Sequence, residues 1–237
     1  MNAVEQPDAP DEGRDGETSR GPRRGSGMLD VTEGREMTFR ILSLAIVLLA
    51  WSCSLSPAVT VHDGDIVFQT SRSAQSQAIQ LATHSAYSHM GIVLYRNGEP
   101  FVFEAVAQVR FTPFQEWVRR GEGGRYVAKR LLDSELLRDP RKLSALRQAA
   151  LAFAGRPYDP YFEWSDDRIY CSELIWKAYD RGLGIQLGAL APLSTFDLSS
   201  QLVKAKLVER FGNRVPSDER VISPSVIFDS PLLERAR

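Results

Sequence analysis

The sequence feature that most constrains the fold is Asn97-Gly98, a dipeptide that lies between two apolar runs. Asn-Gly readily adopts the positive φ angles of a two-residue hairpin loop, so residues 88–95 and 100–106 are predicted to be antiparallel strands. Because the loop sets the register of a hairpin, a two-residue loop pairs Arg96 with Glu99 and fixes every pair behind it.

This register places His89 and Glu104 on one face of the hairpin. Counting back from the loop sets His89 opposite Val106 and Gly91 opposite Glu104. His89 and Glu104 are then diagonal neighbours, roughly 7–8 Å apart at the backbone, and Gly91 leaves space between their side chains. One bulge residue would move them to opposite faces, so the prediction depends on the loop having two residues.

A carboxylate beside an imidazole is what a base needs in nucleophilic catalysis, because the carboxylate fixes the tautomer and stabilises the imidazolium. Taken singly, His89 fits a rim histidine bonded to a carbonyl, and Glu104 fits a solvated charge at a strand end. His84 is a weaker candidate for the base, since it falls at the end of a predicted helix, where histidines cap carbonyls. It also lacks a carboxylate at a comparable position. His62, beside a predicted turn, is weaker still.

Cys171 is the nucleophile that this pair would serve. The four apolar residues Leu174, Ile175, Ala178 and Tyr179 recur at helical spacing, so an amphipathic helix is predicted with Cys171 in its first turn. Free N–H groups and the positive end of the helix dipole stabilise a thiolate there. The alternative is a cysteine packed as a small hydrophobe, which we disfavour because a histidine and a carboxylate are paired earlier in the chain.

The rest of the folded part alternates short strands and helices. Strands are predicted at 66–68 and 125–132, helices at 74–83, 112–118 and 140–153 and within 194–210, a loop at 155–160, and an ordinary tail from Ile222. The 237-residue chain is 43% hydrophobic and 25% charged, enough for one good core once its N-terminal part is set aside. We therefore predict a single catalytic domain over residues 59–237.

Charge and cysteine content exclude several functional classes. A net charge of -1 gives no electrostatic case for nucleic acid as a partner. Cys53 and Cys171 lie in different regions, so no disulfide framework is expected within the domain. Three histidines without a Cys/His cluster argue against structural zinc, and neither a metal nor a cofactor is expected.

The N-terminal part divides into two segments. Residues 1–36 are polar and poor in aliphatic residues, so we expect disorder, and Met28 or Met37 is an alternative start. Residues 37–58 contain an apolar run at 41–51, too short for a bilayer span of about 20 residues but typical of a secretory signal. Cleavage after Ala58, lipidation of Cys53 and retention as an anchor remain open. Each outcome places the domain in the bacterial cell envelope, with any membrane association through residues 41–53.

Five motifs in order carry a resemblance to a known family. They are residues 64–68 (GDIVF), 88–92 (SHMGI), 103–105 (FEA), 155–159 (GRPYD) and 170–174 (YCSEL). Together they resemble the circularly permuted papain-like amidases of the NlpC superfamily, in particular the YiiX-like and YaeF-like branch. Papain-like enzymes carry the cysteine before the histidine, whereas permuted members, like this sequence, carry it after.

The resemblance implies an α+β fold, a small antiparallel sheet packed on the helix that carries the cysteine. It also implies Cys171 as the nucleophile, His89 as the general base and then acid, and Glu104 as the residue that orients His89. Backbone N–H groups at the helix start would bind the oxyanion. Tyr170 is the best candidate for a side-chain donor, although core packing is its commoner role.

The expected activity is hydrolysis of an amide bond through a thioester, by a monomeric enzyme. A peptide or a cell-wall stem peptide is the substrate suggested by family analogy alone. Two alternatives remain: a thiol acyltransferase or esterase that acts on lipids, and an inactive binding module of the envelope. The intact set of Cys171, His89 and Glu104 argues against the inactive module.

Overall fold

The structure is a computed structural model that describes residues 60–236. The expectations for residues 1–36 and 37–58 lie outside the described residues, and the domain boundary at residue 59 stays a prediction. Within the described part, no helix combines the length and the apolar character needed to cross a membrane.

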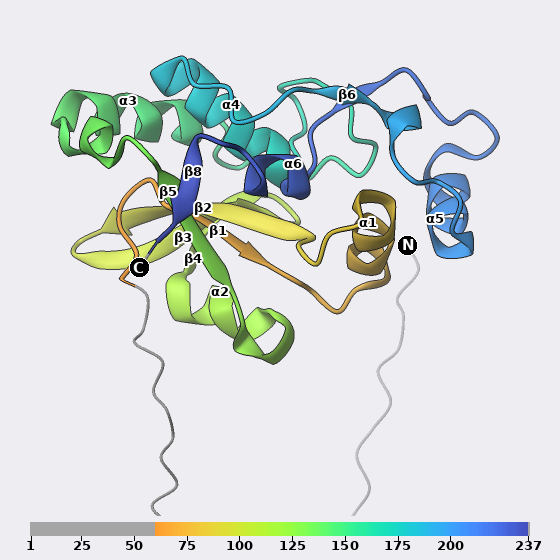
Figure 1. The fold of residues 1–237 in the computed structure, drawn as a ribbon, viewed down its shortest axis with the longest axis horizontal. Helices are drawn as coiled ribbons and strands as arrows, with labels where there is room; N and C mark the ends of the chain where they lie inside the picture. The colour runs from red at the N-terminus through yellow and green to blue at the C-terminus, as the bar shows by residue number, and fades with distance from the viewer. Residues whose placement is uncertain (1–59, 237) are drawn as a thin grey trace, which may run out of the picture. The chain divides into compact units, whose positions relative to one another are not determined.

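A six-stranded antiparallel sheet forms the centre of the fold, in the order β4-β3-β2-β1-β5-β8 (Figure 1). Its strands are β1 (Ile66–Gln69), β2 (His89–Arg96), β3 (Glu99–Ala105), β4 (Val109–Pro113), β5 (Val127–Leu131) and β8 (Leu233–Arg235). A separate short pair consists of β6 (Ala191–Pro192) and β7 (Arg220–Val221).

Helices cover both faces of the sheet, and two further helices stand at one end of the molecule. They are α1 (Ala74–Thr83), α2 (Phe114–Arg120), α3 (Pro140–Leu151), α4 (Cys171–Leu183), α5 (Gln201–Phe211) and α6 (Pro224–Phe228), with short 3₁₀ turns η1 (Glu122–Gly124), η2 (Ser134–Arg138) and η3 (Leu193–Thr195). In Figure 1, α3 and α4 lie above the sheet, α2 lies below it, and α1 and α5 stand side by side at one end. The α+β class and the antiparallel sheet expected from the family resemblance are confirmed.

Local sequence explains where these elements turn and end. Asn97 and Gly98 have φ angles of 52° and 82°, as the two-residue hairpin requires, and Arg96 pairs with Glu99 as predicted. The Ser73 side chain caps α1 by accepting from Ser76 N–H, and α1 spans the predicted residues.

The core has one cluster on each face of the sheet. The larger cluster packs α4, through residues such as Leu174 and Ile175, against Ile92 and Phe103. The smaller cluster packs Trp117 of α2 against strand residues that include Val93. Burial of α4 is nearly complete, since its first nine residues are all buried. The helix that carries Cys171 is therefore the central support of the fold.

Two sequence predictions were wrong. Residues 112–113 end strand β4, and the helix expected at 112–118 begins only at Phe114. Pairing of β4 with β3 overrides the local capping pattern. The tail from Ile222 is also not ordinary, because it forms α6 and then β8, which pairs with β5 and completes the sheet.

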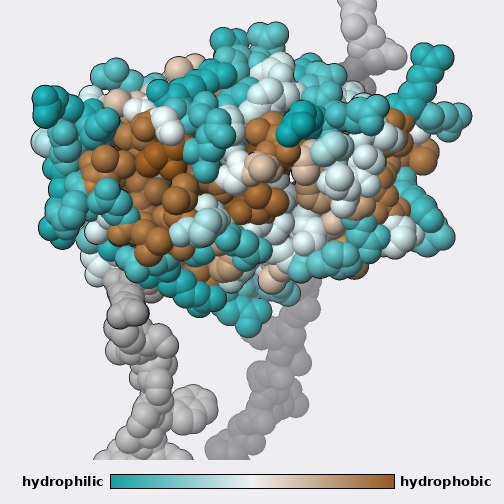
Figure 2. Space-filling model, turned by 45° about the horizontal axis from the view of Figure 1, so that its top comes forward, coloured by the Kyte–Doolittle hydropathy of each residue, from teal (hydrophilic) through white to brown (hydrophobic). Residues whose placement is uncertain are grey.

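The outer surface carries apolar residues as well. Figure 2 shows them gathered in a broad area on the left of that view, bordered by hydrophilic residues. Large exposed apolar side chains of the described part include Leu132, Leu151 and Leu232. Exposed apolar side chains are normal for folded proteins, so this surface does not by itself define a site.

Candidate active site

The β2–β3 hairpin brings His89 and Glu104 into direct contact. Nε2 of His89 lies 2.6 Å from Oε2 of Glu104, and the observed pairing of Ile92 with Phe103 sets Gly91 beside Glu104. A Cβ at Gly91 would lie 3.3 Å from the Cβ of Glu104. The diagonal arrangement predicted from the loop is therefore present, and glycine is what leaves room for it.

Glu104 has further partners that the sequence did not reveal. Its Oε1 accepts a hydrogen bond of 2.5 Å from Thr112 Oγ1 and pairs with the Arg120 guanidinium. Burial alone would raise the pKa of Glu104, but the bond to His89, with the contributions of Thr112 and Arg120, lowers it below its ordinary value. A fully buried carboxylate is thus kept ionised.

Cys171 is the first residue of α4. Glu173 Oε2 accepts a hydrogen bond of 3.3 Å from the Tyr170 N–H, which satisfies one backbone donor before the helix. The thiol is free, and the residue is only 4% exposed. The positive end of the α4 dipole favours a thiolate at this position.

His89 couples these two halves of the site. Burial alone would lower its pKa, but hydrogen bonds with Cys171 and Glu104, together with their charges, raise it to about 9. The imidazolium therefore persists at neutral pH, flanked by a carboxylate and by the cysteine sulfur. An imidazolium at this place stabilises negative charge on the sulfur during nucleophilic attack.

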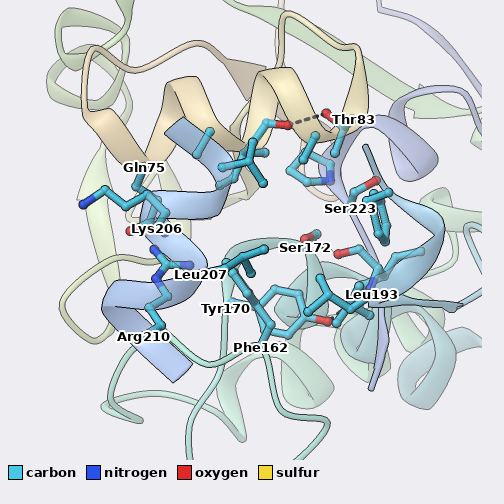
Figure 3. Close-up of a pocket in the computed structure, with 18 of the residues that line it drawn as sticks. Gln75, Thr83, Phe162, Tyr170, Ser172, Leu193, Lys206, Leu207, Arg210 and Ser223 are labelled. Carbon is cyan, nitrogen blue, oxygen red and sulfur yellow. Dashed lines mark hydrogen bonds between the residues drawn. The ribbon is translucent and has the colours of Figure 1, made fainter. Parts of the chain in front are cut away.

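An apolar chamber opens on one side of Cys171. It encloses about 750 Å³ of empty space, including its open mouth, between α1, α5 and the start of α4. Figure 3 shows Lys206 and Arg210 of α5 at the left of the chamber, Phe162 and Tyr170 at its base and Leu193 opposite α5. The walls can hold an apolar group, with two cations on one side.

A second, more polar cavity opens where His89 meets Cys171. It contains about 1050 Å³ of empty space, including its open mouth. Its lining consists mainly of hydroxyl, amide and guanidinium groups and the two reactive side chains, together with three aliphatic residues: Gln69, Ser71, Arg72, Ser73, Gln75, Ser76, Ile79, Ser88, His89, Ala105, Val106, Arg120, Tyr158 and Cys171. Cys171 lines both cavities, so it lies at their junction.

Tyr158 is a site residue that was not among the candidates predicted from the sequence. Its hydroxyl accepts a 2.8 Å hydrogen bond from Gln75 Nε2, and its side chain lines both cavities beside Cys171. Burial and the negative charge of Cys171 raise its pKa, so the hydroxyl keeps its proton. The available sequence signal was its place in the 155–159 motif.

The rival residues have other partners. Tyr170 is buried, and its hydroxyl accepts a 3.1 Å hydrogen bond from the Ile222 N–H. The His84 side chain is 75% exposed and lies 3.2 Å from Asp197, a carboxylate from a distant segment. His84 also ends α1 with a φ of 51°, as a C-cap. His62 donates its backbone N–H to Asp65.

The fold and site define a class of protein, and the chain belongs to it. A family described as "Permuted papain-like amidase enzyme, YaeF/YiiX, C92 family" matches residues 60–236. The chain is 46% identical over 197 residues to "Uncharacterized protein YiiX" of Escherichia coli strain K12, covering 83% of this chain and 94% of that protein. It is also similar to the crystal structure of the metalloprotein yiiX from Escherichia coli O157:H7. That match has a TM-score of 0.71 and 48% identity, and covers 74% of this chain and 96% of the other.

The family resemblance inferred from five motifs is thus confirmed, and the protein is an enzyme of the papain-like cysteine amidase type. The word metalloprotein applies to the Escherichia coli structure. Across residues 60–236 of this chain, no group of three or more His, Cys, Asp or Glu side chains is placed to hold a metal ion.

Proposed function

We propose that the protein hydrolyses an amide bond with Cys171 as nucleophile, His89 as general base and acid, and Glu104 as the residue that orients His89. The observation that carries this proposal is the 2.6 Å contact between His89 Nε2 and Glu104 Oε2. Cys171, like Glu104, raises the pKa of this imidazole. The Glu104 carboxylate orients the imidazole through Nε2, which leaves Nδ1 as the nitrogen that exchanges a proton with the Cys171 thiol.

The proposed reaction has two stages. The Cys171 thiolate attacks the carbonyl carbon, and the C–N bond breaks while His89 gives its proton to the departing amine. Water then adds to the thioester carbonyl as His89 takes a proton from it, and the C–S bond breaks to release the acid. In each stage the oxyanion would accept hydrogen bonds from N–H groups in the first turn of α4.

We assign the side-chain oxyanion donor to Tyr158 in place of Tyr170. Because Gln75 donates to the Tyr158 oxygen, the Tyr158 proton is available for an acceptor in the cavity. The Tyr158 side chain borders Cys171 in both cavities. A Tyr158→Phe substitution is expected to lower kcat more than it raises KM, since the oxyanion forms only after attack.

We propose a peptide, such as a cell-wall stem peptide, as the substrate and the bacterial cell envelope as the location. The location is supported by the apolar run at 41–51, which is typical of a secretory signal, and by the bacterial relatives. Lipid acyl groups are the second candidate, and a specific observation favours them: the chamber beside Cys171 is lined mainly by apolar side chains.

Turnover of matched amides tests the proposal. Short peptide amides and long-chain acyl amides with a common leaving amine would be compared, and the acylated enzyme would be measured by intact mass and peptide mapping. The proposal requires an acyl group on Cys171 and no turnover by Cys171→Ala. Turnover that survives in Cys171→Ala would contradict it. The ratio between the two substrates decides between peptide and lipid.

A further inference from the structure

The two cavities that meet at Cys171 differ in which catalytic group they contain. Cys171 and Ser172, the first residues of α4, line the apolar chamber, and His89 does not. Both His89 and Cys171 line the polar cavity. This asymmetry distinguishes the two ends of a substrate, because the two halves of a cleaved amide need different catalytic groups.

The leaving amine must lie on the histidine side. A general acid has to come within hydrogen-bond reach of the atom that it protonates, and His89 faces only the polar cavity. If the proposed function holds, the acyl part of the substrate extends toward the apolar chamber, and the leaving group occupies the polar cavity.

The polar cavity carries positive charge. The guanidinium groups of Arg72 and Arg120 line it, and none of the described residues in its wall is Asp or Glu. Arg120 uses one NH₂ group on Glu104 while its side chain is 34% exposed, which leaves further N–H donors of the fork for another partner. Arg72 is exposed and forms no ion pair with any residue from 60 to 236.

Hydroxyl groups complete this wall. Ser71, Ser73, Ser76 and Ser88 line the cavity, and Ser76 is hydrogen-bonded to Ser88. Hydroxyl donors and guanidinium forks together suit the oxygens of a carboxylate or a phosphate, for which Arg offers two parallel hydrogen bonds.

We propose that the polar cavity is a subsite for an anionic leaving group, so that the enzyme prefers amides whose amine half carries a carboxylate or a phosphate. Arg72 and the free edge of Arg120 bind the anion. The apolar chamber does not enter this preference, which concerns only the half of the substrate that leaves with the proton of His89.

The test uses one acyl group and compares anionic leaving groups with neutral counterparts. N-acylglycine, N-acyl-β-alanine and N-acyl-γ-aminobutyrate would be compared with their carboxamides, and N-acylphosphoethanolamine with N-acylethanolamine. We expect kcat/KM to favour the anion about tenfold in the best pair, as one charge-assisted hydrogen bond provides. The carboxylate and phosphate series show which anion the subsite takes.

Two variants sharpen the result. Arg72→Glu should abolish or reverse the preference, while Arg119→Glu, an equal charge change on an exposed neighbour of Arg120 outside the cavity wall, should retain it. The preference should also fall as salt is raised. Equal kcat/KM for charged and neutral partners in the wild type, or an unchanged ratio in Arg72→Glu, would overturn the proposal.

Binding to Cys171→Ala separates this proposal from the catalytic one. Calorimetric Kd values for the same charged and neutral pairs are expected to show the same preference without turnover. If the wild type cleaves none of them but Cys171→Ala still favours the anion, the subsite stands and the proposed reaction fails. Equal Kd values for charged and neutral members would exclude the subsite.

Discussion

At the scale of single residues, the site depends on how Glu104 is kept ionised. A buried carboxylate without partners would take up a proton, but His89, Thr112 and Arg120 all contact this one. The carboxylate in turn helps to raise the pKa of His89 to about 9. Both shifts favour the charged pair in the folded protein at neutral pH.

Substitution Glu104→Gln is expected to lower kcat/KM by about 10²-fold or more, since an amide neither stabilises the imidazolium nor fixes the same tautomer. His89 acts as an acid only while protonated, so wild-type activity should fall as pH rises through about 9. In Glu104→Gln this alkaline limb should move toward the ordinary histidine pKa of about 6.5.

The pH profile of kcat/KM measures both effects. Glu99→Gln is the matched control, because Glu99 lies on the same strand, is exposed, and pairs with Arg96 far from the site. An alkaline limb that stays in place in Glu104→Gln would show that Glu104 does not control His89.

At the scale of elements, the β2–β3 hairpin sets the geometry of the site. Its register followed from Asn97-Gly98 alone, so the contact between His89 and Glu104 could be predicted from sequence. The partners Thr112 and Arg120 could not, because Thr112 reaches Glu104 through the pairing of β4 with β3, and Arg120 reaches it from the end of α2. Local capping signals near Thr112 favoured a helix there, and tertiary pairing prevailed.

Gly91→Ala tests the hairpin as an element. An added Cβ would meet Val102 Cγ1, lie 3.0 Å from the Phe103 oxygen and lie 3.3 Å from the Glu104 Cβ. Overpacking of this kind costs about 1–3 kcal/mol, and it should also displace Glu104 and reduce kcat. Urea unfolding and steady-state kinetics measure the two effects.

Gly98→Ala is the matched control on the same hairpin. Gly98 has a φ of 82° and open space around it, so alanine there strains the backbone without reaching the site. It should lower the free energy of unfolding and leave kcat unchanged. A Gly91→Ala variant with wild-type kcat would contradict the role given to the hairpin geometry.

At the scale of the whole molecule, the last strand of the described residues, β8, forms one edge of the sheet. β8 is only three residues long and pairs with β5, about a hundred residues earlier in the chain. Such a short segment carries little periodicity of its own, which is why the tail was predicted to be ordinary. The long, strongly patterned α1, α3 and α4 were predictable, whereas the non-local edge strand was not.

Leu233→Ala is expected to destabilise the fold without altering the chemistry. Leu233 is 6% exposed in the larger core cluster, so its truncation should cost about 2–3 kcal/mol. β8 and β4 lie at opposite edges of the sheet, and kcat should remain at the wild-type value below the unfolding transition. Glu234→Ala, an exposed change on the same strand, is the control. A wild-type free energy of unfolding in Leu233→Ala would contradict this role of β8.

The most direct test of the proposed pair of Cys171 and His89 is the rate of Cys171 alkylation by iodoacetamide as a function of pH, followed on the peptide that contains Cys171. Wild type, His89→Ala and Glu104→Gln would be compared. We expect rapid alkylation at mildly acidic pH in wild type, its loss in His89→Ala and its weakening in Glu104→Gln. If all three proteins follow one curve with the midpoint of an ordinary thiol, about 8.5, Cys171 and His89 do not form a reactive pair and the proposed catalysis is wrong.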